Sequence, residues 1–323
     1  MMNPLHKIVR RSREFCNGVN LIMSQRTEQV QFYNMWHGFE RSDAYLERYL
    51  RAKGLLKSGK TIAVFSCIGP RYLINMVNTD VKIFYTGENV KRYILNKYAD
   101  HALRKPSIDL AMGFEVFEDP RYVRFPLWMD YMFPPESTAD DIRAKCQQLR
   151  YPLSTNTRTE RRFCCMVASN SADGLRDEMM NAISQIEHVD SAGLYLHNDD
   201  SLQKEYNDDK LSYLKSYAFN ICPENTSTYG YTTEKLFEAF TSGCVPIYWG
   251  ADFADKAVIN EDAVIRWNRK DNGAEAIRKI TELWSNPKLL DEFMAQPRLL
   301  PTAEEYILDT FVTLEGKLKA IIS

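Results

Sequence analysis

The segment 217–250, which reads YAFNICPENTSTYGYTTEKLFEAFTSGCVPIYWG, constrains the fold of this chain more than any other segment. Residues 218–222 predict a short buried strand, and the polar loop after them contains turn-forming residues. A helix is expected to begin near Thr232 or Thr233 and to end at Ser242-Gly243, just before a second apolar strand. A strand, a loop, a helix and a strand in this order are typical of an α/β sheet, and the start of such a helix is suited to binding anions.

The expected start of this helix brings charged and aromatic residues together. Lys235 would lie in the first turn, where the positive end of the helix dipole disfavours a cation unless a negative group lies between them, so we expect an anionic ligand. Glu234 is adjacent, and Asn225 and Tyr231 precede it. These residue types suit a nucleotide sugar, with a ring for the base or sugar, a carboxylate for ribose hydroxyls and a lysine for pyrophosphate. The alternative is that the loop is only a solvated connection.

The size and charge of the chain limit its class. Its 323 residues are many for a single core, so two domains are expected. With 45% apolar and 26% charged residues, it has the composition of a folded protein rather than a disordered one. The formal net charge is -2, and no basic stretch interleaved with aromatic residues occurs. Nucleic acid is therefore not expected among its partners.

The cysteines and the apolar runs of the sequence indicate where in the cell the protein is expected. The seven cysteines show neither a CxxC pair nor a Cys/His ligand spacing, so we expect reduced, buried thiols and a cytoplasmic protein. No run approaches the roughly 20 apolar residues of a membrane span, and the first residues lack the apolar core of a signal peptide. Basic residues among apolar ones from Lys7 to Arg13 are interpreted as a solvated helix face. Peripheral contact with the inner face of the cytoplasmic membrane is the alternative.

Strands that alternate with helices predict two parallel sheets. We expect the first sheet to form within residues 1–155, the second within 156–300, and a C-terminal helix over 301–323. The 4-3-4-3 apolar spacing of that helix favours docking on the body of the protein, and a homodimer seam is the alternative. The main expected strands are Val30–Trp36, Thr61–Cys67, Val81–Tyr85, Ile108–Phe114 and Phe163–Ala168, with an edge segment at Tyr122–Leu127.

Polar residues just after predicted strands are candidate site residues, because open α/β sheets bind ligands beyond the carboxyl ends of their strands. Glu88 follows one strand, and Gly87 would allow a tight turn that presents Glu88 as a general base. The alternative for Glu88 is a turn carboxylate that caps the next helix. Ser169, Asn170 and Arg176 follow another strand and offer phosphate donors, although an arginine on an exposed helix face is the commoner arrangement.

A metal site is not expected. The five histidines show no paired ligand spacing, and the adjacent aspartates at 140–141, 199–200 and 208–209 are interpreted as solvated acids. Positive charge from Arg176, Lys235 and the helix N-termini would then have to stabilise a leaving diphosphate. No cofactor is expected to be required, and stimulation by a divalent cation stays open.

An ordered set of motifs resembles the bacterial α1,3-fucosyltransferases of glycosyltransferase family 10. In the first half these are FYTGEN at 84–89, AMGFE at 111–115 and RFPLW at 124–128. In the second half they are VASN at 167–170, FNICPEN at 219–225, YGYTTEK at 229–235 and VPIYWG at 245–250. Their order is the order of the family, so the combination is far more specific than any one motif.

The resemblance implies a fold and roles for residues. It implies the GT-B architecture, in which two Rossmann-like domains face an interdomain cleft, with GDP-L-fucose on the C-terminal domain and the acceptor mainly on the N-terminal one. Glu88 matches the proposed catalytic base of the family, and Ser169 and Asn170 fall in a matching motif. The positions that match donor-binding residues are Arg176, Asn225, Tyr231, Glu234 and Lys235. The chain ends after a single C-terminal helix without heptad repeats, which puts dimerisation through that region in doubt.

The expected reaction is an inverting transfer of L-fucose from GDP-β-L-fucose. The resemblance favours the 3-hydroxyl of N-acetylglucosamine in a lactosamine- or lactose-type oligosaccharide acceptor, with a Lewis X-like product. Alternatives are an α1,3/4 linkage, another acceptor or nucleotide sugar, or a two-domain sugar-binding protein without activity. Aromatic stacking suggests acceptor contacts beyond one strand end, at Trp36, His37, Phe39, Glu40 and Arg41.

Overall fold

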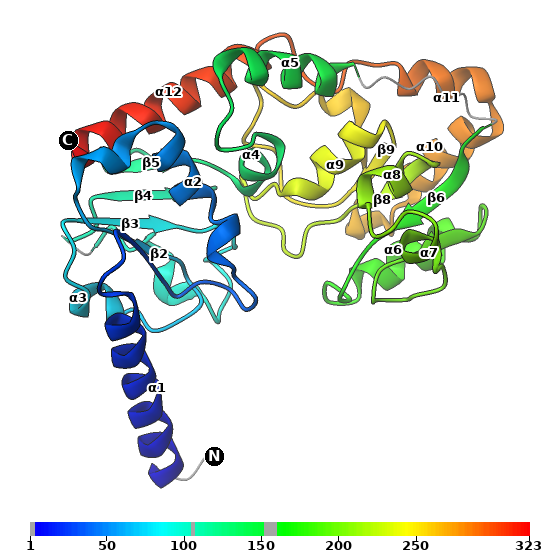
Figure 1. Cartoon of the computed structure of the whole chain (residues 1–323). Helices are drawn as coiled ribbons and strands as arrows, with labels where there is room; N and C mark the ends of the chain where they lie inside the picture. The colour runs from blue at the N-terminus through cyan, green and yellow to red at the C-terminus, as the bar shows by residue number, and fades with distance from the viewer. Residues whose placement is uncertain (1–3, 105–106, 152–159) are drawn as a thin grey trace. The chain divides into compact units, whose positions relative to one another are not determined.

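The computed structural model describes residues 4–104, 107–151 and 160–323, and side chains from residue 13 onward (Figure 1). It divides into two compact units, which are described separately. Unit 1 comprises residues 1–125 and 310–323, and unit 2 comprises residues 126–309. Most of the basic pattern between Lys7 and Arg13 lies outside the described side chains.

Unit 1 contains a five-stranded parallel sheet in the order β1-β2-β3-β4-β5. Nearly all of its strand residues are buried, which explains why the strands are continuous apolar runs rather than alternating patterns. The strands are β1 (Val30–Tyr33), β2 (Ile62–Phe65), β3 (Val81–Tyr85), β4 (Leu110–Gly113) and β5 (Tyr122–Arg124). They fall inside the ranges expected from the sequence, and each is as short as or shorter than expected.

Helices of unit 1 connect and cover this sheet. From Thr310 onward, α12 belongs to unit 1, where Phe311 packs against Tyr49 and Phe125. In the same part of the helix, the ammonium group of Lys317 donates to two carbonyl groups beside β5. The α-helices are α1 (Pro4–Gln25), α2 (Tyr45–Ala52), α3 (Leu73–Met76) and α12 (Ala303–Ile322), and the short 3-10 helices are η1 (Arg41–Asp43), η2 (Leu55–Ser58) and η3 (Asn96–Tyr98).

Unit 2 contains a second five-stranded parallel sheet, in the order β10-β9-β8-β6-β7. Its strands are β6 (Arg162–Met166), β7 (Val189–Ser191), β8 (Tyr217–Ile221), β9 (Val245–Tyr248) and β10 (Ile265–Arg266). The edge strands β7 and β10 were not expected, because runs of three and two residues carry too little pattern to recognise.

The helices of unit 2 bury apolar faces against this sheet. The core includes Phe163, Leu175, Met179, Phe219 and Ile280, each at most 3% exposed. The α-helices are α4 (Leu127–Met132), α5 (Ala139–Arg150), α6 (Leu175–Ile183), α7 (Ser201–Lys204), α8 (Lys210–Leu214), α9 (Glu234–Ser242), α10 (Ala274–Ser285) and α11 (Pro287–Met294), and the 3-10 helices are η5 (Glu261–Ala263) and η6 (Arg269–Asp271).

The boundary between the compact units differs from the boundary expected at residue 155. The chain enters unit 2 at Pro126, because α4 and α5 pack against α9 rather than against the first sheet. Trp128 of α4 stacks on Phe237 of α9 with 4.3 Å between ring centroids. The proline-rich, polar stretch that suggested the boundary follows these helices, and residues 152–159 lie outside the described part. The change in amino-acid composition that suggested residue 155 therefore does not mark the point where the chain passes from unit 1 to unit 2.

The expected fold class, α/β with two mostly parallel sheets, is confirmed. Among the helices of the described residues, none is both long and apolar enough to cross a lipid bilayer.

Candidate functional site

The carboxylate of Glu224 organises the loop between β8 and α9. Glu224 is fully buried, and it accepts hydrogen bonds from the Thr233 N–H at 2.7 Å and the Thr233 hydroxyl at 2.7 Å. The hydroxyl of Tyr248 donates to the same carboxylate at 3.2 Å. Thr233 is the N-cap residue of α9, and its side chain makes no capping bond to the first turn, because its hydroxyl donates to Glu224 from the preceding loop. Burial raises the pKa of the Glu224 carboxyl group.

Lys235 lies in the first turn of α9, as expected, and the protein itself supplies negative partners for it. Its Nζ lies 3.0 Å from Glu234 Oε1 and 3.6 Å from Glu224 Oε2, and it donates to the Thr233 hydroxyl at 2.8 Å. Burial alone would lower the pKa of Lys235, but Glu224 and Glu234 outweigh burial and raise that pKa. The position of Lys235 by itself therefore does not require a ligand, contrary to the argument from the helix dipole.

Glu234 keeps one oxygen available. Its Oε1 accepts from Lys235, whereas its Oε2 is buried and has no hydrogen-bond partner among the described residues. Burial would raise the pKa of Glu234, but Lys235 lowers it below its ordinary value, so the group is ionised at neutral pH. A buried carboxylate oxygen without a partner is costly unless a ligand donates to it. Sugar hydroxyls are donors of the right kind.

Arg176 joins two of the predicted loops. Arg176 is 3% exposed, and its guanidinium group donates to the backbone and side-chain oxygens of Asn170, both at 2.6 Å, and to Asn225 Oδ1 at 3.0 Å. It is therefore not on an exposed helix face. Burial lowers the pKa of Arg176, and Glu224 partly offsets this effect. The three predicted residues Arg176, Asn170 and Asn225 thus meet at the carboxyl ends of β6 and β8.

The sequence interpretation missed the residues that complete this cluster. A small hollow at the ends of β6 and β8 is lined by Arg176, Lys235 and also Lys210 and Glu238. The ammonium group of Lys210 lies 2.5 Å from Glu238. Lys210 and Glu224 were overlooked because they lie in polar segments whose burial the sequence does not reveal. The available signals were the position of Lys210 at the start of α8 and that of Glu224 shortly after β8.

The remaining predicted donor residues lie around this cluster. Ser169 and Asn170 are exposed in the loop after β6, and Tyr231 is 5% exposed in the loop before α9. Ala172 and Asp173, at φ 49° and 55°, adopt left-handed backbone conformations before Gly174 begins α6. This loop turns sharply, which brings Asn170 back onto Arg176.

Glu88 lies in unit 1, in the tight turn directly after β3. Its N–H donates to the hydroxyl of Thr86 at 3.0 Å, and the backbone N–H of Thr86 bonds to the carbonyl of Met112 on β4. Thr86 and Asn89 on either side are each 2% exposed, whereas Glu88 is half-buried. A rigid, buried turn therefore presents the Glu88 carboxylate at the carboxyl end of a central strand.

The predicted acceptor residues separate into two groups. Trp36, Phe39 and Arg41 line a groove at the carboxyl ends of β1 and β2, whereas His37 and Glu40 are exposed outside it. Trp36 and Phe39 meet edge to face, with 5.1 Å between ring centroids. The guanidinium group of Arg41 bonds to Glu28 at 2.8 Å and to Glu47 at 2.9 Å, so its charge is already paired.

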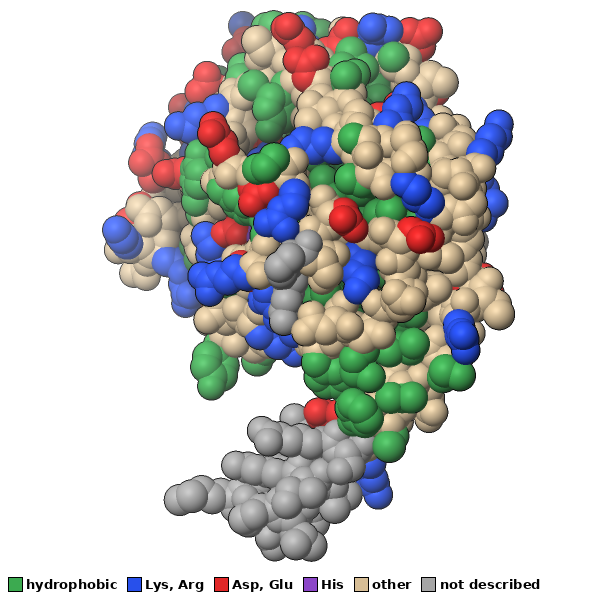
Figure 2. Space-filling view, turned by 90° about the vertical axis from the view of Figure 1, so that its left-hand side faces the viewer, with side chains coloured by type: hydrophobic (Ala, Val, Ile, Leu, Met, Phe, Trp, Pro, Cys, Tyr) green, Lys and Arg blue, Asp and Glu red, His purple; other side chains and the backbone are tan. Residues whose placement is uncertain are grey.

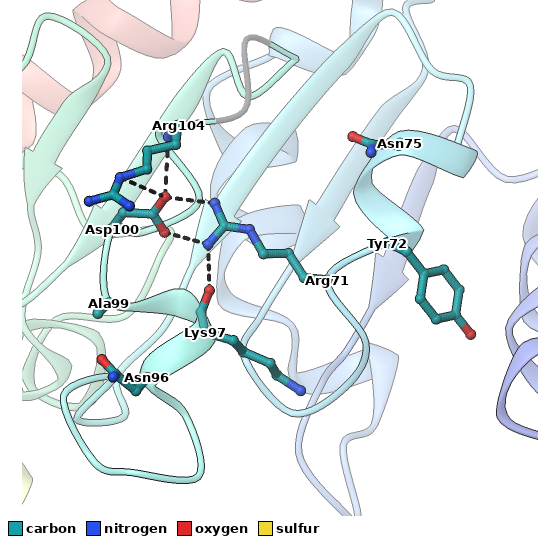
Figure 3. A pocket seen from close by; sticks show the side chains of 8 residues that line it. All are labelled: Arg71, Tyr72, Asn75, Asn96, Lys97, Ala99, Asp100 and Arg104. Atoms are coloured by element: carbon teal, nitrogen blue, oxygen red, sulfur yellow. Dashed lines mark hydrogen bonds and ion pairs between the residues drawn. The ribbon is translucent and has the colours of Figure 1, made fainter. Parts of the chain in front are cut away.

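Another hollow of unit 1, of about 900 Å³, is lined by several basic residues (Figure 3). Figure 3 shows Arg71 turned toward Asp100, which it contacts through two hydrogen bonds of 2.6 Å. Arg104 also approaches Asp100, at 3.9 Å. The pairing of Arg71 with Asp100 joins the segment just before α3 to the segment just after η3. These charges therefore stabilise the fold.

Among the described residues, no group of three or more His, Cys, Asp or Glu side chains is arranged to hold a metal ion. All seven cysteines are unpaired, and each is buried except Cys16.

Comparison with known proteins identifies the family. Residues 30–131 match the family model described as the alpha-(1,3)-fucosyltransferase FucT N-terminal domain, and residues 156–298 match the C-terminal model of glycosyltransferase family 10 (fucosyltransferase). The alpha-(1,3)-fucosyltransferase FucT of Helicobacter pylori is 29% identical over 211 residues, which are 55% of this chain and 40% of that protein. Alpha-(1,3)-fucosyltransferase B of Drosophila melanogaster is 28% identical over 148 residues, 43% of this chain and 33% of that protein.

A solved structure has the same fold. The crystal structure of an α1,3-fucosyltransferase with GDP-fucose has a TM-score of 0.57 to this chain at 21% identity, and the match covers 90% of this chain and 89% of that one. The sequence matches span less than half the length of the two curated relatives. The first half of the chain matches the N-terminal domain model and the second half matches the C-terminal one. The chain also has the fold of a solved α1,3-fucosyltransferase. The chain belongs to the fucosyltransferases of glycosyltransferase family 10.

Proposed function

We propose that this chain transfers L-fucose from GDP-β-L-fucose to a hydroxyl group of an oligosaccharide. One observation carries the proposal: beside Lys235 and Arg176, the buried Glu234 carboxylate has an oxygen without a partner among the described residues. A nucleotide sugar offers hydroxyls for that oxygen and a diphosphate for the cations. The family supplies the identity of the sugar.

In the proposed reaction, inversion occurs in a single in-line displacement. The acceptor oxygen attacks the anomeric carbon of fucose as the bond from that carbon to the β-phosphate oxygen breaks. Glu88 takes the proton of the acceptor hydroxyl, and GDP leaves with the bonding electron pair. Arg176 and Lys235 stabilise the charge that develops on the diphosphate, and Glu234 accepts from a ribose hydroxyl. Because GDP is a good leaving group, no second carboxylic acid is needed, unlike in glycoside hydrolysis.

The acceptor we propose is a lactosamine-type oligosaccharide. The hydroxyl attacked is the 3-hydroxyl of its N-acetylglucosamine, which would give a Lewis X-like product. Two findings support this α1,3 assignment: the family model that matches residues 30–131, and the resemblance of residues 84–89 and 124–128. A cytoplasmic location is also proposed, and the unpaired cysteines, of which six are buried, support it.

The direct test is incubation with GDP-fucose and a panel of lactose, lactosamine and type 1 acceptors, with and without EDTA, followed by linkage analysis. We expect a new α1,3-fucosyl bond on lactosamine, release of one GDP per bond, and a rate that EDTA leaves within about twofold. A product linked at another hydroxyl would contradict the regiochemistry. The absence of both transfer and GDP binding would contradict the function itself.

Replacement of Arg176 by lysine tests the donor site. Lysine keeps the charge, but its single ammonium group cannot replace the two guanidinium nitrogens that donate to Asn170 and to Asn225. Loss of one charge-assisted hydrogen bond, about 1.5 kcal/mol, predicts roughly a tenfold rise in the KM for GDP-fucose. The matched control is Arg278→Lys on the exposed face of α10, whose side chain is 69% exposed. An unchanged KM in the Arg176→Lys enzyme would show that the loop contact is dispensable for donor binding.

A further inference from the structure

Helix α1 precedes the region that matches the family, which begins at residue 30. Although most of the side chains in its second half are exposed, this half contacts the rest of unit 1 at Phe15, Gly18 and Gln25. A Cβ atom added to Gly18 would lie 2.9 Å from Leu73 and 3.3 Å from the Tyr72 hydroxyl, so the glycine permits this approach. The rings of Phe15 and Tyr72 lie 6.1 Å apart. The middle of α1 therefore contacts the residues at the start of α3.

The end of α1 is also joined to the first strand. The Gln25 side-chain amide donates to the carbonyl of Phe32 at 2.7 Å and accepts from the N–H of Phe32 at 2.7 Å. Because β1 is an edge strand, this amide takes the place of a neighbouring strand at that position. Figure 2 shows hydrophobic side chains gathered on the lower part of the face where α1 meets the rest of unit 1.

One face of α1 forms a wall of the groove that contains Trp36. Glu14, Gly18, Leu21 and Gln25, spaced as neighbours on a helix face, line it. The groove has a volume of about 590 Å³, within the usual range for ligand pockets. The opposite wall comes from β1 and from the loops after β1 and β2, and it carries Phe32, Asn34, Trp36, Phe39, Ile68 and Pro70.

The groove shares an edge of the sheet with the proposed catalytic base. The strand order β1-β2-β3 places the loop of Glu88 two strands away from the loop of Trp36, or roughly 10 Å at ordinary strand spacing. Asn34 connects the two regions, because its amide donates to the Tyr98 hydroxyl at 2.9 Å in the segment that follows Glu88. One sugar ring does not span that separation, whereas an oligosaccharide does.

We propose that this groove is an acceptor subsite for a sugar residue remote from the one that receives fucose, and that α1 is a specificity-determining wall of it. The proposal rests on the proposed function. The half-exposed Trp36 ring offers a flat face for the C–H groups of a sugar, and polar residues such as Asn17 and Glu14 at the rim offer partners for its hydroxyls. The substrate class is an oligosaccharide acceptor long enough to reach from Glu88 to Trp36.

The test compares two acceptors, N-acetylglucosamine and a tetrasaccharide that contains lactosamine. For Trp36→Ala and for Leu21→Ala on α1, the ratio of kcat/KM for the tetrasaccharide to that for the monosaccharide is expected to fall at least tenfold. The control is Met23→Ala, which is also on α1 and 60% exposed but does not line the groove, and its ratio should stay within twofold. An unchanged ratio in Trp36→Ala and Leu21→Ala would overturn the proposal, as would an equal loss with both acceptors.

A second measurement separates this proposal from the proposed function. Tetrasaccharide binding to the full-length chain is followed by titration calorimetry in the presence of GDP. If the wild-type chain transfers no fucose but binds the tetrasaccharide, and Trp36→Ala binds it at least tenfold more weakly, the subsite stands and the proposed reaction fails. If transfer occurs and Trp36→Ala binds the tetrasaccharide as the wild type does, the subsite fails and the reaction stands.

Discussion

Lys235→Met is expected to lower kcat/KM for GDP-fucose at least a hundredfold and to lower the melting temperature by about 10 °C. The activity falls because Lys235 is a proposed cation for the leaving diphosphate. The stability falls because Glu224, fully buried, loses the ammonium group 3.6 Å away, and breaking such a buried pair typically costs about 3–5 kcal/mol. Donor kinetics and thermal unfolding measure the two effects.

A double variant separates these two roles of Lys235. Lys235→Met with Glu224→Gln removes the unpaired buried charge, so part of the lost melting temperature should return while transfer stays low. Lys204→Met is the control, because this lysine pairs with Asp200 on the surface with 72% of its side chain exposed, and such pairs contribute about 1 kcal/mol or less. If activity returned together with stability in the double variant, Lys235 would have only a structural role.

Glu88→Gln is expected to lower kcat for fucosyl transfer by a factor of about 10²–10⁴, the usual contribution of a general base. Glutamine is close in shape to glutamate but cannot take the proton of the acceptor. The affinity for GDP should change little, because Glu88 lies in unit 1 and the proposed donor residues lie in unit 2. Steady-state kinetics with lactosamine and titration calorimetry with GDP measure the two quantities.

The control for Glu88 is Glu118→Gln, an exposed carboxylate of the same unit that follows β4 rather than β3. Its kcat should stay within twofold of the wild type. A Glu88→Gln enzyme with normal turnover would rule out Glu88 as the base. Tighter or weaker binding of GDP by more than tenfold would instead show that Glu88 acts on the donor.

Lys235 separates what local sequence patterns predict from what they cannot. Its place in the first turn of a helix followed from the capping pattern and from Ser242-Gly243, where Gly243 ends the helix with φ 74°. Its counter-charge did not follow, because Glu224 lies in what the sequence presents as an exposed, turn-prone loop. The backbone of that loop bonds to the end of β9, which buries the carboxylate beneath α9. Burial depends on contacts between strands and cannot be found in a local pattern.

The predicted acceptor residues show a similar limit. The sequence placed an aromatic cluster just beyond a strand end, and the structure brings Trp36, Phe39 and Arg41 together there. The sequence could not distinguish these three residues from His37 and Glu40. The direction of a side chain in an irregular loop depends on backbone angles such as φ 79° at Gly38. The contribution of α1 was also invisible, since Gly18 and Gln25 have meaning only against Tyr72, Leu73 and β1.

The sequence by itself determined the two parallel sheets and most strand positions, because buried strands leave local apolar patterns. It also indicated the family, through the resemblance of its ordered motifs. The tertiary structure alone decided the unit boundary, the small edge strands and the charge balance of the proposed donor cluster. It also decided that Arg176 is buried between two loops rather than exposed. Each of these depends on which distant segments come into contact, and the free energy of a charge changes most when such contacts remove water from it.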